Sequence, residues 1–103
     1  MKLYIDSSEF GKVMFVLTDH RKTIKRAYVI KPSETHKTME LLDKFLSSLR
    51  IKDKGLRINK IVVCKGPGSF TAIRVGLSIV QALSLAWEIP LQILSKSSFQ
   101  KIL

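Results

Sequence analysis

The sequence predicts one α/β domain over residues 1–103, in which a five-stranded mixed sheet carries helices packed on it. Two patterns favour this class. The first 30 residues hold three short segments rich in β-branched and aromatic residues, separated by polar turns. In the rest of the chain, segments with helical periodicity alternate with short apolar runs, as strands and helices do when they follow one another. A domain of 103 residues buries roughly 65% of its unfolded surface, so a partner would add to its stability.

The first three elements are expected to be strands. They span Lys2–Asp6, Lys12–Thr18 and Thr23–Ile30, and polar turns at residues 7–11 and 19–22 separate them. Because the turns are short, neighbouring strands must run in opposite directions. The three strands are therefore predicted to form an antiparallel meander.

A helix is expected after the meander. Pro32 and Ser33 break the strand pattern, and a helix is predicted from Glu34 to Ile51. It is amphipathic, because its apolar residues recur at helical spacing. These residues are Met39, Leu42, Phe45, Leu46 and Leu49.

The second half of the chain is predicted to alternate strand and helix. Pro90 is expected to stop the helix that begins at Thr71. The whole order, three strands and then helix, strand, helix, strand, helix, resembles that of the ribonuclease H-like domain in the actin, Hsp70 and sugar-kinase superfamily. The predicted elements are a basic connection at Lys52–Arg57, a strand at Ile58–Lys65, a helix at Thr71–Trp87, a strand at Leu91–Leu94 and a helix at Ser97–Leu103.

The most informative segment is KGPGSFTAIRVG, residues 65–76, which joins the fourth strand to the second helix. Gly66 and Gly68 permit backbone conformations or close approaches that a Cβ would forbid, and Ser69 or Thr71 can cap the helix. Such a corner can hold an anion, although the segment lacks the Lys-Ser/Thr ending of a P-loop. The alternative is a rigid strand-to-helix turn. The candidate contacts of an anion are Asp6, Ser7, Gly66, Gly68, Ser69 and Arg74.

The string GPGSFTAIR resembles the GPGSFTGLR signature of the TsaB (YeaZ) family, and KLYIDSS at the start resembles that family's first strand. Ala72 stands where a glycine is usual. The resemblance covers only the amino-terminal half of such proteins. The matching signature positions are Gly66, Pro67, Gly68, Ser69, Phe70, Thr71, Arg74 and Gly76.

This resemblance implies a function and partners. TsaB proteins are the non-catalytic members of the bacterial machinery that makes threonylcarbamoyladenosine on tRNA. The chain would then be a cytoplasmic scaffold subunit, not an enzyme, that binds the paralogue TsaD, with the TsaE ATPase as a further partner. It would form a homodimer when alone and meet tRNA through the complex. A single half offers only one wall of the superfamily's nucleotide cleft, so no cofactor is expected.

The second predicted helix is apolar nearly all round, since no charge interrupts it from Val75 to Trp87. The sheet can cover only one side of such a helix, and exposed apolar surface commonly marks a protein partner. The alternative is an ordinary core helix. The residues expected at a partner seam are His36, Met39, Leu42, Phe45, Ile73, Gly76, Leu77 and Val80.

The chain is strongly basic, with 18 Lys and Arg against 8 Asp and Glu and a formal net charge of +10. Polyanions are plausible partners, so the competing hypothesis is a small basic ribonuclease H-like nucleic-acid-binding or resolvase-like domain. Solvated sheet edges explain the charge equally well. The basic residues gather in two clusters: Arg21, Lys22, Lys25, Arg26 and Lys31, and Arg50, Lys52, Lys54, Arg57 and Lys60.

The sequence gives little support for a catalytic site. A two-metal nuclease needs several carboxylates, and Asp6 is the only acid on a predicted strand near the loop. His20 and His36 are far apart in sequence, so no metal site is expected, and Cys64 has no neighbouring base. One cysteine favours a reducing compartment. The uncharged run from Val75 to Trp87 is shorter than the ~20 residues of a membrane span, so no membrane contact is expected.

Overall fold

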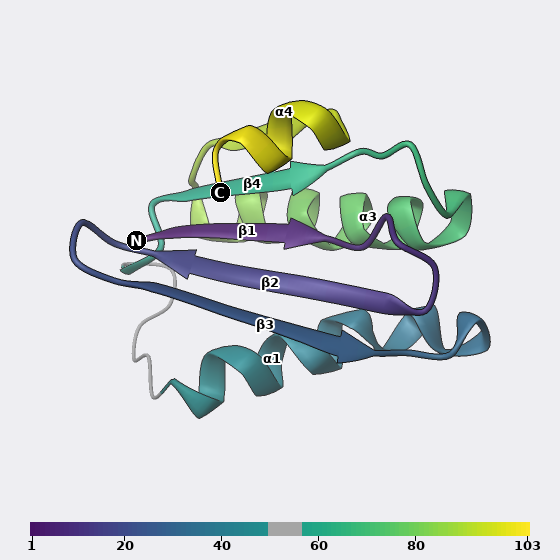
Figure 1. The fold of residues 1–103 in the computed structure, drawn as a ribbon. Coiled ribbons are helices and arrows are strands. Elements are labelled where there is room, and N and C mark those ends of the chain that lie inside the picture. Colours follow the sequence, from purple (N-terminus) through teal and green to yellow (C-terminus); the bar gives the residue numbers. More distant parts are fainter. Residues whose placement is uncertain (50–56) are drawn as a thin grey trace.

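The computed structural model describes residues 1–49 and 57–103. Its five strands are β1 Lys2–Asp6, β2 Lys12–Thr18, β3 Thr23–Val29, β4 Lys60–Cys64 and β5 Leu91–Leu94. They form one sheet in the order β3-β2-β1-β4-β5 (Figure 1). The first three strands pair antiparallel, whereas β4 is parallel to both β1 and β5. The predicted mixed five-stranded sheet is therefore confirmed.

The helices are η1, a 3-10 helix at Pro32–Lys37, and the α-helices α1 at Thr38–Ser48, α3 at Phe70–Trp87 and α4 at Lys96–Lys101. α1 and α3 pack on one face of the sheet, and the short α4 packs on the other (Figure 1). The two faces thus receive unequal cover.

The first predicted helix was too long. Its expected opening, from Glu34, is a 3-10 turn because Pro32 sits at the start and Glu34 has a non-helical backbone (φ −112°, ψ 17°). α1 then ends at Ser48. The predicted connection at Lys52–Arg57 lies outside the described residues, apart from Arg57.

The main core lies between the sheet and the two long helices. Alternate strand residues such as Leu3, Ile5 and Phe15 point to this face, as the two-residue period of a strand requires. Phe15 meets Phe45 of α1 in a stacked arrangement, with ring centroids 5.6 Å apart. Val80 of α3 closes the same cluster and is fully buried. These contacts fix α1 and α3 relative to the strand ends that carry the glycine loop.

A smaller core occupies the other face. Tyr4, Val16 and Val62 point to it from three neighbouring strands, and Phe99 of α4 packs edge-on against Tyr4 with ring centroids 6.1 Å apart. Since α4 packs against β4 and β5, the face over β2 and β3 has no helix on it among the described residues. On this face Val16 of β2 is buried, whereas Lys25, Ala27 and Val29 of β3 are exposed.

α3 ends before the proline that was predicted to stop it. Glu88 adopts the left-handed conformation (φ 54°), and the amide of Ile89 then donates to the carbonyl of Ser84 at 3.1 Å. The Ser84 hydroxyl in turn donates to the Ile89 carbonyl at 2.5 Å. These bonds satisfy the unpaired backbone groups at the end of the helix. The helix has therefore ended before Pro90, and the proline is not what stops it.

The β2–β3 turn is organised by one carboxylate. Asp19 Oδ1 accepts hydrogen bonds from the backbone amides of Arg21 at 2.7 Å and Lys22 at 2.9 Å. The bond from Arg21 is the main reason that the pKa of Asp19 is lowered from its usual 3.8. An ionised Asp19 therefore favours the folded state.

We expect Asp19→Asn to flatten the acid limb of the stability curve. Because the folded pKa of Asp19 lies below the unfolded value, its contribution is present above the unfolded pKa and is lost as the pH falls through the folded pKa. The asparagine oxygen still accepts the two bonds but does not titrate. Urea unfolding of both proteins between about pH 6 and pH 3 should show the wild-type advantage shrinking with acid; an advantage independent of pH would contradict this role.

Candidate functional site

The glycine loop is held against the turn that follows β1. The Ser69 amide donates to the Ser8 carbonyl at 2.8 Å. Gly68 approaches the same carbonyl so closely that an added Cβ would overlap its oxygen and lie 2.8 Å from its carbon. Gly66 has a φ of +94°, which favours glycine. Two segments far apart in sequence thus meet backbone to backbone, and both predicted roles of the glycines are confirmed.

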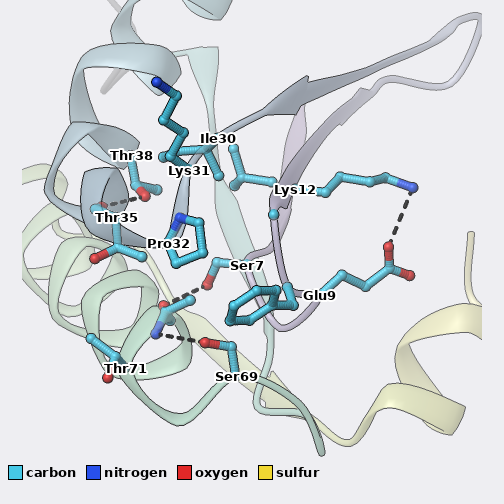
Figure 2. A pocket seen from close by; sticks show the side chains of 14 residues that line it. Ser7, Glu9, Lys12, Ile30, Lys31, Pro32, Thr35, Thr38, Ser69 and Thr71 are labelled. Carbon is cyan, nitrogen blue, oxygen red and sulfur yellow. Dashed lines mark hydrogen bonds and ion pairs between the residues drawn. The ribbon is translucent and has the colours of Figure 1, made fainter.

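The predicted cap of α3 is also confirmed. Ser69, and not Thr71, is the N-cap residue, and its hydroxyl accepts a hydrogen bond from the Ala72 amide at 3.4 Å. From the other side, the Ser7 hydroxyl donates to the Ala72 carbonyl at 2.9 Å. The first turn of α3 is therefore fixed by one serine from each segment (Figure 2).

The polar groups at the end of β1 are used inside the domain. Asp6 Oδ1 accepts hydrogen bonds from the amide of Ser8 at 2.8 Å and from its hydroxyl at 2.5 Å. The Cys64 thiol points to the same hydroxyl, with its sulfur 3.7 Å away. Burial raises the pKa of this thiol, so it stays protonated and is a poor nucleophile. Asp6 thus organises the turn that follows β1, whereas Ser7 holds the first turn of α3.

Gly76 belongs to this same junction. It is buried, and a Cβ added there would overlap the Ser7 hydroxyl oxygen while lying 3.4 Å from the Ser7 Cβ. The prediction that Gly76 faces a partner is therefore wrong. Its missing side chain instead makes room for the bond from Ser7 to the carbonyl of Ala72.

A double-mutant cycle can measure this packing. Gly76→Ala alone gains about 1 kcal/mol of helix propensity, but it displaces the Ser7 hydroxyl and loses a bond worth about 1 kcal/mol. In a Ser7→Ala background the added methyl meets only Cβ, so we expect Gly76→Ala to stabilise by about 1 kcal/mol. Urea denaturation of the four proteins gives the coupling energy. Equal effects of Gly76→Ala in both backgrounds would contradict the contact.

A hollow of about 140 Å³ lies beside this junction. Figure 2 shows Ser7 and Ser69 at its edge, with Lys12 directed to Glu9 and away from both serines. Lys12 and Glu9 form an ion pair at 3.3 Å. Ligand pockets for drug-sized molecules commonly measure about 300–1,000 Å³, so this hollow is small for a nucleotide.

The predicted anion contacts are brought together only in part. Ser7 and Ser69 line the hollow, whereas Asp6, Gly66 and Gly68 do not. Arg74 does not line the hollow either and lies over the ring of Phe70, 5.4 Å from its centroid. An anion at this corner stays a prediction.

A larger groove lies between η1, α1 and α3 and has a volume of about 490 Å³. We call it the η1–α3 groove. Phe70 and Met39 at its sides are 72% and 43% exposed, which is unusual for large apolar residues. It is lined by His36, Met39, Phe70, Thr71, Arg74, Val75, Ser78 and Ile79.

The structure corrects half of the residues that were predicted to face a partner. His36 and Met39 do lie in it. Leu42, Phe45 and Val80 are at most 1% exposed inside the main core, so the prediction that they meet a partner is wrong. The remaining two predicted residues, Ile73 and Leu77, are partly covered by the domain itself.

The reason is that α1 and α3 each have apolar residues on two faces. Helical spacing identifies such faces but does not show which of them packs against the sheet. Val75 and Ile79, which are half-buried and lie on other sides of α3 than Val80, line the groove. The sequence feature that could have identified these two residues is their position in an apolar helix that no charge interrupts.

α3 is incompletely covered. It has 18 residues and is apolar enough, by length and composition alone, to cross a membrane, yet only 17% of it is buried. One such helix is weak evidence for a span, because helices of soluble proteins pass the same test. Its fully buried residues are Gly76 and Val80. The rest of α3 is half-buried or exposed, and its exposed large apolar residues, Phe70 and Leu85, are available to a partner.

Among the described residues no group of three or more His, Cys, Asp or Glu side chains could hold a metal ion. The resolvase-like alternative needs such a group. It therefore finds no catalytic site in the described part of the chain.

Comparison with known proteins identifies the relatives of this chain. The family model of TsaD, tRNA N6-adenosine threonylcarbamoyltransferase, matches residues 29–97. The tRNA threonylcarbamoyladenosine biosynthesis protein TsaB of Buchnera aphidicola (subspecies Schizaphis graminum) is 36% identical over 77 residues, which are 69% of this chain and 36% of that protein. TsaB of Bacillus subtilis is 28% identical over 100 residues, 97% of this chain and 42% of that protein. The chain therefore spans less than half the length of these curated relatives.

Solved structures give the same answer for the fold. YeaZ from Pseudomonas aeruginosa superposes with a TM-score of 0.78 at 21% identity, covering 91% of this chain and 43% of the other. RuvC of T. thermophilus, solved with a Holliday junction substrate, superposes less well, with a TM-score of 0.58 at 12% identity, covering 93% of this chain and 64% of the other. The ribonuclease H-like architecture of the chain is thereby confirmed.

Proposed function

The chain belongs to the family that the TsaD model describes, as a member similar to TsaB and YeaZ, and from this premise we propose that it is a non-catalytic scaffold subunit of tRNA threonylcarbamoyladenosine synthesis. It binds the TsaD paralogue through the η1–α3 groove. In that complex it supports threonylcarbamoyl transfer to the adenosine next to the tRNA anticodon. The complex works in the cytoplasm, where TsaE is a further partner.

One observation carries the proposal: an apolar groove between η1, α1 and α3, with Phe70 and Met39 exposed at its sides. Val75 and Ile79 of α3 form one wall of the η1–α3 groove, and Met39 of α1 forms the other. Exposed apolar patches of this kind mark protein interfaces in soluble proteins. Two helices side by side offer a seam into which the helices of a second subunit pack.

The polar residues of the groove suit a protein partner as well. Arg74 is held over Phe70 by a cation–π contact, so its guanidinium stays at the rim with its donors free for a carboxylate or carbonyl. His36 lies at the opposite rim and is exposed. An apolar centre with Arg and aromatic residues beside it is the usual composition of a binding hot spot.

An accessory role agrees with the state of the polar residues. The carboxylate of Asp6 is engaged by Ser8, and the Cys64 thiol is buried and protonated. Neither is available to react. The chemistry of the transfer is therefore assigned to TsaD, and this chain contributes surface.

We expect the double variant Phe70→Asp/Met39→Asp to lose binding to TsaD at least tenfold. It places two negative charges on the sides of the groove, and burying them against an apolar partner is costly. Phe70 is the first residue of α3, where an aspartate favours the helix dipole, so the fold should persist. Co-expression with TsaD from the same genome, followed by size-exclusion chromatography, measures the loss.

A matched control changes two exposed apolar residues elsewhere. Val29→Asp/Ile102→Asp adds the same charge at residues that are 94% and 49% exposed and do not line the groove. It should co-elute with TsaD as the wild type does. Normal co-elution of Phe70→Asp/Met39→Asp would refute the seam. If the wild-type protein does not bind TsaD but co-floats with phosphatidylglycerol vesicles, α3 is a membrane contact. That result would refute the proposal too.

The same groove would serve a homodimer. The wild-type chain alone should elute as a dimer, and Phe70→Asp/Met39→Asp as a monomer, because self-association and TsaD binding compete for one surface. A dimer that survives in the variant would place self-association on another face.

A further inference from the structure

A second surface lies at the other end of the sheet, where β1 and β4 begin. Lys2 and Lys60 are direct register partners on these two parallel strands. Side chains of register partners point to the same face about 5 Å apart, and like charges so placed repel each other. Both lysines lie on the face of Tyr4 and Val62, since residues two apart share a face. No ion pair among the described residues involves either lysine.

A hollow of about 360 Å³ opens at this end of the sheet; Lys2 lines it, and Lys60 directly follows its lining residue Asn59. We call it the amino-end hollow. It is lined by Met1, Lys2, Tyr4, Thr18, Asp19, His20 and Asn59.

Its polar side chains are unused. Within the described residues, the side chains of Lys2, Thr18 and Asn59 make no hydrogen bond or ion pair. The one acid in the lining, Asp19, is already engaged by the backbone amides of its own turn. The hollow therefore presents an ammonium, a hydroxyl and an amide to solvent, a donor set that suits phosphate oxygens.

Further positive charge continues along the same face. Lys25 pairs with Val16 across β2 and β3, which puts it on the face of Tyr4, and no helix covers that region in the described part of the chain. Arg21 and Lys22 follow in the adjoining turn and are exposed. The strip is too long for one small anion and fits a polymer with regularly spaced charges.

Among the residues that the structure describes, no exposed Phe, Tyr or Trp lines the hollow. Tyr4 is only 8% exposed and packs on Phe99. The imidazole of His20 is the one exposed ring in this described lining. A single small ring gives successive bases little to stack on, so the contact is with the phosphate backbone.

We propose that the amino-end hollow and the strip beside it bind the phosphate backbone of RNA, with Lys2 and Lys60 as the central cations. The choice of tRNA as that RNA rests on the proposed function. The hollow lies at the opposite end of β1 and β4 from the junction of Ser7 with α3, so one chain can hold TsaD and tRNA at the same time.

The test is tRNA binding by the double variant Lys2→Gln/Lys60→Gln. Fluorescence anisotropy with a labelled, unmodified tRNA transcript should give a Kd at least about fivefold weaker than for the wild type, and a salt dependence shallower by about 1–2 in slope. The control Lys44→Gln/Lys65→Gln removes the same charge from α1 and from the far end of β4. Its Kd should stay within about twofold of the wild type.

Equal weakening by both pairs would show that only net charge matters and would overturn the inference, as would no weakening by either. Displacement of tRNA by polyglutamate of equal charge would overturn it too, because the hollow would then accept any polyanion. Co-elution of Lys2→Gln/Lys60→Gln with TsaD separates this inference from the proposed function. If Lys2→Gln/Lys60→Gln co-elutes with TsaD and binds tRNA as the wild type does, only the hollow is refuted. If this variant loses tRNA binding but the wild-type protein does not co-elute with TsaD, only the groove is refuted.

Discussion

Gly68→Ala is expected to destabilise the domain by about 3 kcal/mol or more, at the upper end of what overpacking costs. The new methyl group would overlap the Ser8 carbonyl oxygen. That carbonyl is backbone and also accepts the amide of Ser69 at 2.8 Å, so it cannot move without breaking the junction. A domain of this length has about 5–15 kcal/mol of total stability. Thermal unfolding should show the loss as a Tm decrease of roughly 4–8 °C per kcal/mol.

Gly11→Ala is the matched control. Gly11 has a φ of +78°, and the nearest atom to an added Cβ is the Ile30 carbonyl oxygen at 3.8 Å. The alanine therefore meets left-handed strain of about 1 kcal/mol and no clash. Gly68 has no such positive φ, so a larger loss there isolates the contact with Ser8. Equal losses in the two variants would mean that the loops are not in contact in solution.

The junction also shows what could be predicted from the sequence. The glycine loop, its cap and its place between a buried strand and a helix follow from local signals, because Gly and Ser act on their own neighbours. The partner of Gly68 is Ser8, on a different strand end, and no local signal connects the two. The need for glycine was therefore predictable, but the group that imposes it was not.

The strands were predicted closely for a similar reason. β1, β2 and β5 have the predicted bounds, since alternation and turn residues are local features. α1 was predicted less well, because the spacing of Leu42, Phe45 and Leu46 is helical whether or not the preceding turn is. Pro32 and the non-helical Glu34 make that turn a 3-10 helix.

The prediction of the partner face was wrong for a different reason. An apolar helix side can turn to the sheet or to solvent, and the choice depends on the sheet's own side chains. Phe15 points to the face on which α1 lies, and its ring takes Phe45. Met39 falls on another side of α1 and stays 43% exposed. This assignment of one residue to the core and the other to the groove can be tested directly.

Phe45→Ala is expected to cost about 3–5 kcal/mol, the usual cost of removing a buried phenylalanine. Phe45 is fully buried and stacks on Phe15, so the truncation leaves a cavity that the sheet cannot close. Met39→Ala, on the same helix, removes an exposed side chain and should cost less than about 1 kcal/mol. Urea unfolding of the free chain measures both.

The two variants should exchange rank when TsaD binding is measured. Met39→Ala removes a contact of the η1–α3 groove and should weaken binding, whereas Phe45→Leu keeps the core nearly filled and should bind as the wild type does. Stability and binding would then depend on different residues of one helix, as the burial of Phe45 and the exposure of Met39 require. A Phe45→Leu protein that unfolds at the wild-type urea concentration but no longer binds TsaD would return Phe45 to the interface and would refute this division of α1.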